Sequence, residues 1–329
     1  MHGEPAGVSL GYWQDRDPLE ALTTAEVADG LGYGSLWLGE MATFDVFALA
    51  TAVGLRTSSI PLTIGPLAAA VRDPAGVAMG VASVAALTGR QVDVALGSSS
   101  AVVVRQWHGR PYERLARTLA ESASALRPLL AGERSAYAGD VHRSTGYRLR
   151  LPAPGASITV AAFGPRSVEV AAQHGDRMVI NLCTPALAAR LRADVDAATT
   201  GAGRERIPLA AWVPAAVDPS PEAVDQLRRA LVSYLAAPGY DEMFDRAGFG
   251  DAVTVAKSGA HPRDVLAAVP AELVEAVAVI GDEAACRHRL GDFADAGVDQ
   301  IVLVPATAGD DDGRRTLTSL APRSAPARS

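Results

Sequence analysis

The segment from residue 60 to residue 109 constrains the fold more than any other part of the chain. Two short apolar runs, residues 62–67 and 92–96, flank a stretch in which Asp73 and Pro74 occupy a helix N-cap and the first helical position. Gly89 supplies a left-handed helix end. The apolar runs lack strict alternation, which is typical of strands buried on both faces of a parallel sheet. The segment therefore predicts a β-α-β unit, with a loop of small residues after its second strand.

The same alternation recurs along the chain. A predicted helix ends in a glycine, and a strand follows within a few residues, at Gly32, Gly89, Gly175 and Gly297. Units of this kind close well into an eight-fold barrel. An open doubly wound sheet is the alternative, but no predicted strand is followed by GxGxxG and no break introduces a second domain. We expect the α/β class, with a (β/α)8 TIM barrel that carries surface insertions.

The predicted barrel domain spans residues 1–309. Residues 132–157 are polar and rich in turn formers, which predicts a surface insertion such as a hairpin. Residues 239–260 place Tyr240, Phe244 and Phe249 among glycines, which predicts an irregular lid or pocket wall. Residues 310–329 are acidic and then rich in Pro, Ser and Arg, so we expect a flexible C-terminal tail.

Composition argues against several classes of function. The net charge of −7 over 329 residues, without a basic cluster, disfavours nucleic-acid binding. No apolar run approaches the roughly 18 residues that span a bilayer, and no signal peptide is visible. Cys183 and Cys286 form no disulfide framework, and the dispersed histidines lack metal-ligand spacing. We expect a cytoplasmic protein whose partner is a small molecule, without a metal site.

Ligands of a barrel bind at the carboxyl ends of its strands, which selects candidate residues. Glu40 follows a predicted strand, where partial burial could raise its pKa into the range of a general acid or base. Alternatively, Glu40 is a surface carboxylate that caps the next helix. Gly65 and Pro66 lie inside a buried strand, where proline removes a hydrogen-bond donor. A bulge or cis peptide facing a ligand would explain them, and so would a simple strand end.

Three later segments are also candidates. The loop of Gly97, Ser98, Ser99 and Ser100 could hold a ring or phosphate, or could be a plain flexible loop; it lacks the G-x-S-x-G pattern of serine hydrolases. His108 is either a catalytic residue at the barrel mouth or a structural one.

The third segment is a helix start at Gly164, Pro165, Arg166 and Ser167. Helix-terminal amides and a guanidinium suit a phosphate, whereas the alternative is an ordinary helix start with a solvated arginine. The same strand-end rule selects Ala162, Phe163 and Asn181.

Several segments together resemble the luciferase-like monooxygenase superfamily, and specifically its actinobacterial branch of oxidoreductases that depend on the deazaflavin coenzyme F420. The segments are residues 31–40 (LGYGSLWLGE), 72–74 (RDP), 87–97 (LTGRQVDVALG), 112–117 (YERLAR), 126–132 (LRPLLAG) and 161–167 (AAFGPRS). The resemblance extends from about residue 8 to about residue 305.

The resemblance implies a (β/α)8 barrel, often a homodimer, that binds F420 or FMN at its mouth. It places Glu40 near the cofactor ring, and it places a bulge or cis peptide behind the ring at Gly65, Pro66 and Leu67. It also assigns the loop of residues 97–100 to the ring and cofactor tail, and residues 163–167 to a phosphate. Two positions depart from relatives: Met41 replaces a histidine and Ser100 replaces a glutamate, which argues against sugar-phosphate dehydrogenase chemistry.

The sequence thus predicts an F420-dependent oxidoreductase that moves a hydride between the cofactor and a small, apolar organic substrate. Glu40 would handle the proton or polarise the ring, while Tyr240, Phe244 and Phe249 would shape the substrate side. The alternatives are an FMN-dependent monooxygenase and a non-catalytic flavin-binding barrel. The identity of the substrate does not follow from the resemblance.

Overall fold

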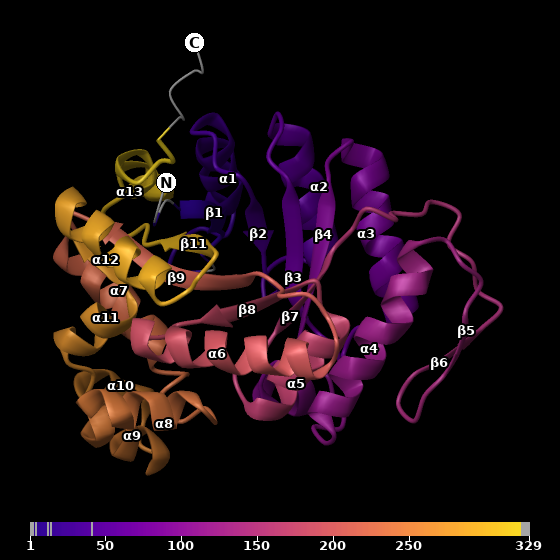
Figure 1. Ribbon diagram of the computed structural model, residues 1–329. Coiled ribbons are helices and arrows are strands. Elements are labelled where there is room, and N and C mark those ends of the chain that lie inside the picture. The colour runs from indigo at the N-terminus through magenta and orange to yellow at the C-terminus, as the bar shows by residue number, and fades with distance from the viewer. Residues whose placement is uncertain (1–2, 4, 12, 14, 41, 324–329) are drawn as a thin grey trace. The chain divides into compact units, whose positions relative to one another are not determined.

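The computed structural model describes residues 3, 5–11, 13, 15–40 and 42–323 (Figure 1). The strands are β1 (Pro5–Ser9), β2 (Leu36–Leu38), β3 (Leu62–Ala68), β4 (Val92–Gly97), β5 (Ala136–Ala138), β6 (Arg143–Thr145), β7 (Ile158–Ala161), β8 (Arg177–Asn181), β9 (Leu209–Val217), β10 (Val279–Gly281) and β11 (Gln300–Pro305). The α-helices are α1 (Glu20–Gly30), α2 (Val46–Arg56), α3 (Pro74–Thr88), α4 (Leu115–Leu130), α5 (Pro165–His174), α6 (Pro185–Gly201), α7 (Pro221–Leu231), α8 (Tyr240–Phe244), α9 (Gly250–Lys257), α10 (Pro262–Ala267), α11 (Ala271–Val277), α12 (Glu283–Asp295) and α13 (Arg314–Ser319). Shorter helical turns of other types are η1 (Val102–Trp107), η2 (Asp245–Phe249) and η3 (Asp311–Gly313).

The main sheet closes on itself. Its strand order is β10-β9-β11-β1-β2-β3-β4-β7-β8, and β9 also pairs with β8. Eight strands therefore form a ring, and β10 pairs in parallel with the last three residues of β9. This confirms the predicted (β/α)8 barrel and rules out the open doubly wound sheet. In the part of the chain that the structure covers, no helix is both long and apolar enough to cross a bilayer.

The chain packs as two compact units. One comprises residues 34–179 and 191–210, and the other comprises residues 1–33, 180–190 and 211–329. The first unit contains the β-α-β segment on which the sequence prediction rested. The Asp73 side chain accepts a hydrogen bond from the amide of Gly76, Pro74 begins α3, and Gly89 ends it in the left-handed conformation with φ 69°. The predicted start and end of this helix are confirmed.

The second unit contains the segment that the sequence predicts as a flexible tail. Residues 311–319 instead form η3 and α13, and the side chains of Leu317 and Leu320 are fully buried. Asp310 is buried as well, and its carboxylate accepts hydrogen bonds from the amides of Arg315 (2.8 Å) and Thr316 (3.0 Å). The acidic composition suggested disorder, but Asp310 caps a helix whose leucines join the core.

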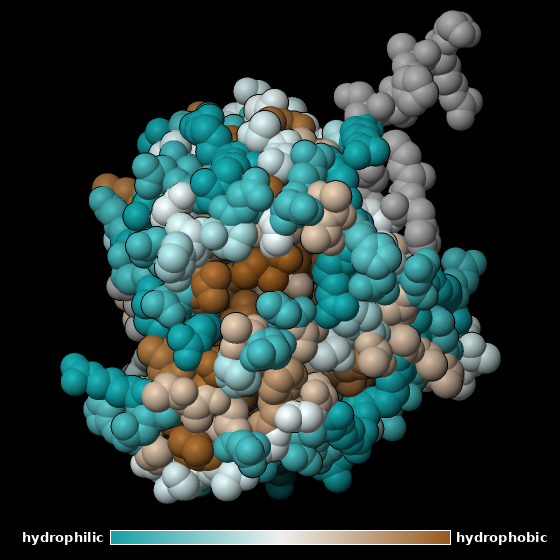
Figure 2. All heavy atoms as spheres, turned by 90° about the vertical axis from the view of Figure 1, so that its left-hand side faces the viewer, coloured by the Kyte–Doolittle hydropathy of each residue, from teal (hydrophilic) through white to brown (hydrophobic). Residues whose placement is uncertain are grey.

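The outer face that carries α7, α11 and α12 is mostly hydrophilic. Figure 2 views this face and shows apolar side chains gathered in its hollows. On this face, apolar surface is recessed between polar side chains.

The two predicted insertions differ in outcome. Within residues 132–157, β5 and β6 form an antiparallel pair, as expected of a hairpin. Residues 239–260 are helical rather than irregular: α8, η2 and α9 follow one another, with a kink at Gly248 (φ 95°). Lys257 forms an ion pair with Asp241 and so ties α9 to α8.

A buried carboxylate anchors the hairpin. Glu121 of α4 is 4% exposed, and its oxygens accept hydrogen bonds from the amides of Asp140 (3.0 Å), Val141 (2.8 Å) and His142 (3.0 Å). Arg117 donates to the same carboxylate at 2.7 Å. Burial by itself raises the pKa of Glu121, but the amide of His142, the guanidinium of Arg117 and the other two amides outweigh burial and lower the pKa to about 2.

We predict that Glu121 stabilises the hairpin in a pH-dependent way. Because its pKa is lower in the folded state, its contribution is present above pH 4.5 and is lost as the pH falls toward 2. Glu121→Gln should cost about 1–3 kcal/mol of local stability at pH 7. Hydrogen exchange of the Asp140, Val141 and His142 amides should accelerate in this variant at pH 7. Glu133→Gln is the control, and unchanged exchange in the Glu121 variant would contradict the assignment.

Candidate active site

Glu40 is held by an arginine from a different segment. Arg72 donates from Nε to Glu40 Oε2 at 3.1 Å, and from Nη2 to Oε1. The same Nη2 contacts Asp45 Oδ2 at 2.5 Å, and the guanidinium lies over the ring of Phe47, 5.4 Å from its centre. One cation therefore joins two carboxylates just past the carboxyl end of β2.

Asp45, not Glu40, caps the next helix. The Asp45 side chain accepts from the amides of Phe47 (3.0 Å) and Ala48 (3.2 Å) at the start of α2. Burial raises the pKa of Asp45, but the hydrogen bonds from Arg72 and from these amides outweigh burial and leave the pKa below its ordinary value. Hydrogen bonding to Glu40 raises the pKa of Arg72. The capping alternative for Glu40 is therefore wrong, whereas its role in catalysis stays a prediction.

The interruption of β3 falls where the sequence predicts it. The Gly65–Pro66 peptide bond is cis, and the register between β3 and β4 shifts between Ile64 and Leu67. Gly65 has φ 120°, and a Cβ on it would lie 2.2 Å from the carbonyl oxygen of Ala95. Only glycine fits so close to the neighbouring strand. The simple strand end is therefore wrong, and a bulge with a cis peptide is present.

Small side chains meet at the ends of three neighbouring strands. A Cβ on Gly97 would lie 3.2 Å from Cβ of Pro66 and 3.4 Å from Cβ of Ala161. These residues belong to β4, β3 and β7, so the strand ends have little side-chain bulk between them. Leu67 and Ala162 are buried beside this strip rather than presented from it.

The serine loop is tied in place. The carbonyl of Ser99, a residue with φ 58°, accepts a hydrogen bond from the Tyr112 hydroxyl at 3.0 Å. The hydroxyl of Ser100 accepts from the amide of Val103 at 3.3 Å and so leads into the π-helical turn η1. A plain flexible loop is therefore not what the structure shows, although Ser98, Ser99 and Ser100 as cofactor ligands stay a prediction.

Two amides assigned to a phosphate already have a partner. The hydroxyl of Ser167 accepts from the amides of Phe163 and Gly164, both at 3.2 Å, and donates to the Gly164 carbonyl at 2.8 Å. Arg166 is exposed at the first turn of α5. A phosphate here would share or replace these long amide contacts, with Arg166 free to move toward it.

Asn181 lies in the other unit with two tyrosines. Its Nδ2 is 3.5 Å from the Tyr234 hydroxyl, and its side chain also bonds Tyr240. The tyrosine rings meet edge to face with centres 5.0 Å apart. Burial raises the pKa of both tyrosines, so both stay protonated near neutral pH. The cluster therefore offers neutral hydrogen-bond donors.

Other predicted residues lie in less suggestive places. His108 is exposed at the end of η1, and its catalytic role stays a prediction. Phe244 is fully buried, so its ring belongs to the core and not to a substrate wall. Burial raises the pKa of Cys183 to about 12, which fits a buried small hydrophobe. Met41 lies outside the described residues. Within those residues, no group of three or more His, Cys, Asp or Glu side chains could hold a metal ion.

The chain matches, over residues 5–300, the family described as luciferase-like monooxygenase. The chain belongs to this family. The resemblance drawn from the sequence is thereby confirmed. As a luciferase-like monooxygenase family member, it is 25% identical over 286 residues to a 5,10-methylenetetrahydromethanopterin reductase of Methanolobus tindarius, covering 84% of this chain and 87% of that protein. It is also 25% identical to a Mycobacterium tuberculosis protein described as a coenzyme F420-dependent oxidoreductase, covering 97% and 99% of the two chains.

Solved structures show the same family fold. The F420-dependent tetrahydromethanopterin reductase from Methanopyrus kandleri superimposes with a TM-score of 0.84 at 17% identity, covering 97% of this chain and 98% of that one. The FMN complex of the oxygenating component of 3,6-diketocamphane monooxygenase from Pseudomonas putida has a TM-score of 0.70 at 17% identity, with 97% of both chains covered. At this identity the likeness shows the fold alone.

Sequence reasoning missed Arg72, although its motif was noticed. Arg72 stands directly before Asp73 and Pro74, in the RDP segment that contributed to the family resemblance. An arginine between a strand end and a helix N-cap was the available signal. Its partner Glu40 is 32 residues earlier, and only the pairing of β2 with β3 brings the two segments together.

We predict that Gly65→Ala destabilises the protein by at least about 2 kcal/mol, because the new Cβ would clash with the Ala95 carbonyl. Urea unfolding followed by circular dichroism measures the change. Gly30→Ala is the control, since a Cβ there meets nothing within 4 Å inside α1 and should be neutral or slightly stabilising. A Gly65→Ala midpoint equal to that of the wild type would refute the close-packing argument.

Proposed function

We propose that the protein is an F420-dependent oxidoreductase that transfers a hydride between the deazaflavin and a small organic substrate. The observation that carries the proposal is the arrangement at the carboxyl ends of β2, β3, β4 and β7. Leu38 pairs with Ile64, so Glu40 and Pro66 occupy equivalent positions beyond adjacent strands. Beside them, Pro66, Gly97 and Ala161 form a strip of small residues. The names of the two curated relatives support F420 as the cofactor.

The residues at these strand ends fit a flat ring with a phosphate tail. A larger residue at Gly97 would place its Cβ 3.2 Å from Pro66, so glycine keeps this strip low. The hydroxyl of Ser167 and the guanidinium of Arg166 would hold the phosphate at the start of α5. The bound deazaflavin supplies hydride transfer, and the chain supplies position and exclusion of water.

Glu40 is the group that would hold or move a proton. Its two oxygens accept from Arg72, and Asp45 shares the same guanidinium. This arrangement fixes the carboxylate at the end of β2, where it can accept a proton from a substrate hydroxyl or return it. Positioned acids and bases of this kind contribute about 10²–10⁴-fold to rates.

An FMN-dependent monooxygenase is the second candidate. The description of the matched family and the shared fold with the diketocamphane monooxygenase favour it. A non-catalytic flavin-binding barrel is the third. The homodimer and the cytoplasmic location implied by the family resemblance stay predictions.

Cofactor binding separates these candidates. Titration of the purified protein with F420 and with FMN, followed by fluorescence quenching, should give micromolar affinity for F420 and much weaker binding of FMN. Preference for FMN would favour the monooxygenase, and binding of neither would end both flavin-dependent proposals. In the same assay, Arg166→Ala should weaken F420 binding by about 1.5–3 kcal/mol. The deazaflavin riboside, which lacks the phosphate-bearing tail, should bind both proteins alike.

Turnover tests Glu40. Glu40→Gln keeps the shape of the side chain but cannot take up the proton, so kcat should fall at least about 10²-fold. The assay follows oxidation of reduced F420 with a carbonyl substrate found by screening the wild type. Asp45→Asn is the matched control, because Asn also caps helices and also loses charge beside Arg72. Equal rates for the Glu40 variant and the wild type would remove Glu40 from the mechanism.

A further inference from the structure

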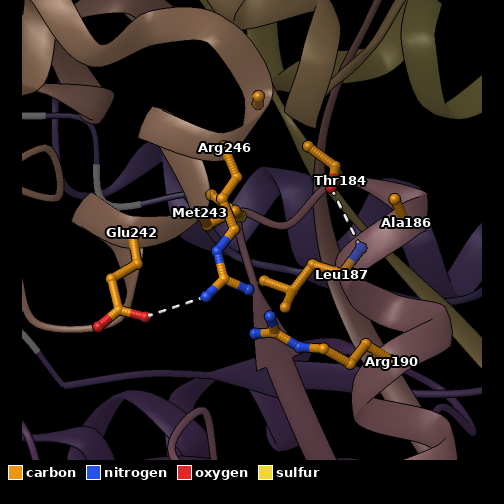
Figure 3. A pocket seen from close by; sticks show the side chains of 8 residues that line it. Thr184, Ala186, Leu187, Arg190, Glu242, Met243 and Arg246 are labelled. Atoms are coloured by element: carbon orange, nitrogen blue, oxygen red, sulfur yellow. Dashed lines mark hydrogen bonds and ion pairs between the residues drawn. The ribbon is translucent and has the colours of Figure 1, made fainter.

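A pocket at the start of α6 has an unusual charge balance. Its volume is about 300 Å³, and it is lined by Thr184, Ala186, Leu187, Arg190, Glu242, Met243, Arg246 and Ala247. All of these residues belong to one compact unit. Two segments supply them, the loop and first turns that follow β8 and the helical segment α8–η2. Arg190 and Arg246 come from opposite walls, and in Figure 3 their guanidinium groups extend toward one another.

The positive charge of the pocket is not balanced by its own residues. Glu242 lies 3.8 Å from Arg246, but both side chains are well exposed, and such a pair is worth little. No carboxylate among the described residues forms an ion pair with Arg190. The chain carries a net charge of −7, so two arginines facing each other do not reflect a general excess of positive charge.

Helix α6 adds to the same field. Thr184 caps this helix: its hydroxyl accepts from the amide of Leu187 at 3.2 Å, and its carbonyl accepts from that of Ala188 at 3.0 Å. The amino end of a 17-residue helix carries partial positive charge, and Arg190 lies within its first two turns. A cation at this end is unfavourable unless an anion is near. An anion between Arg190 and Arg246 would relieve both repulsions.

The floor of the pocket is apolar. Leu187 and Met243 are both largely buried, and Ala186 and Ala247 complete the lining. A ligand would therefore place a charged end between the arginines and a few carbon atoms against Leu187 and Met243. Phosphate esters and small organic acids have this character.

The pocket is continuous along the chain with the tyrosine cluster. Asn181 precedes Thr184 by three residues, and Tyr240 precedes Glu242 by two. We propose that this pocket binds a phosphate or carboxylate group of a ligand of the reaction. The assignment of that group to the substrate rests on the proposed function, because the cofactor phosphate is already assigned to Arg166 and Ser167. The substrate would then be an anionic molecule with a short apolar part, rather than the wholly apolar one that the sequence predicts.

Titration with inorganic phosphate, followed by calorimetry, tests the pocket without any cofactor. Arg190→Gln and Arg246→Gln should each weaken phosphate binding about tenfold, and the double variant should abolish the heat of binding at this site. Arg263→Gln, an exposed arginine of α10, is the matched control and should bind like the wild type. Both pocket arginines are solvent-exposed, so the variants should keep the thermal midpoint of the wild type. Arg166→Ala identifies any heat that comes from the other predicted phosphate site.

F420 then distinguishes the sources of the anionic group. If the double variant loses phosphate binding but binds F420 like the wild type, the group belongs to the substrate. If F420 binding also weakens while the deazaflavin riboside still binds normally, the pocket serves the cofactor tail. Phosphate binding that is the same in the double variant and the wild type would overturn the proposal. A wild type that binds phosphate through these arginines but does not bind F420 would refute the proposed function and leave the anion site standing.

Discussion

A buried arginine at the amino ends of the strands determines where chemistry can occur in the unit of residues 34–179 and 191–210. Arg177, the first residue of β8, lies over the ring of Trp37 at 4.5 Å and donates to the Thr159 hydroxyl at 2.9 Å. Its guanidinium is 3.9 Å from Asp93. Burial lowers the pKa of Arg177, and the negative charge of Asp93 acts in the opposite direction. Because this cluster fills the interior at the amino ends of β2, β4, β7 and β8, only the opposite ends of these strands are left for a ligand.

The carboxyl ends use the opposite strategy. There the strands carry Gly65, Pro66, Gly97 and Ala161, and close backbone contact replaces side-chain packing. Charge appears only at the margin, where Arg72 holds Glu40 and Asp45 together. An acid–base group on a rigid strand end, clamped by a guanidinium that is itself shared, is restricted in position before any ligand arrives. Such preorganisation is what a proton-handling residue requires.

Local signals in the sequence were enough to predict the parts of the structure that depend on near neighbours. Asp73, Pro74 and Gly89 define α3 through their own backbone preferences, and the Gly65–Pro66 pair marked the irregular strand end. The contacts that the sequence did not reveal join distant segments or unusual helices. The Arg72 contact with Glu40 needs the pairing of β2 and β3. The π-helical turns η1 and η2 have no residue preference that distinguishes them from loops, so Arg246 could not be placed beside Arg190. The C-terminal helix α13 escaped prediction because its stability comes from burial of Leu317 and Leu320.

The barrel itself does not decide between hydride transfer and oxygenation. The chain shares its fold with an F420-dependent reductase and with an FMN-dependent monooxygenase, at TM-scores of 0.84 and 0.70. What can differ between such enzymes lies in the side chains at the strand ends and in the segments that follow them. In this chain those segments carry isolated arginines: Arg166 at the start of α5, Arg190 in α6 and Arg246 in η2. In a protein of net negative charge, arginines that gather after strand ends select ligands by their anionic groups. Specificity therefore depends on where the charged ends of cofactor and substrate are held, while the small-residue strip accepts any flat ring.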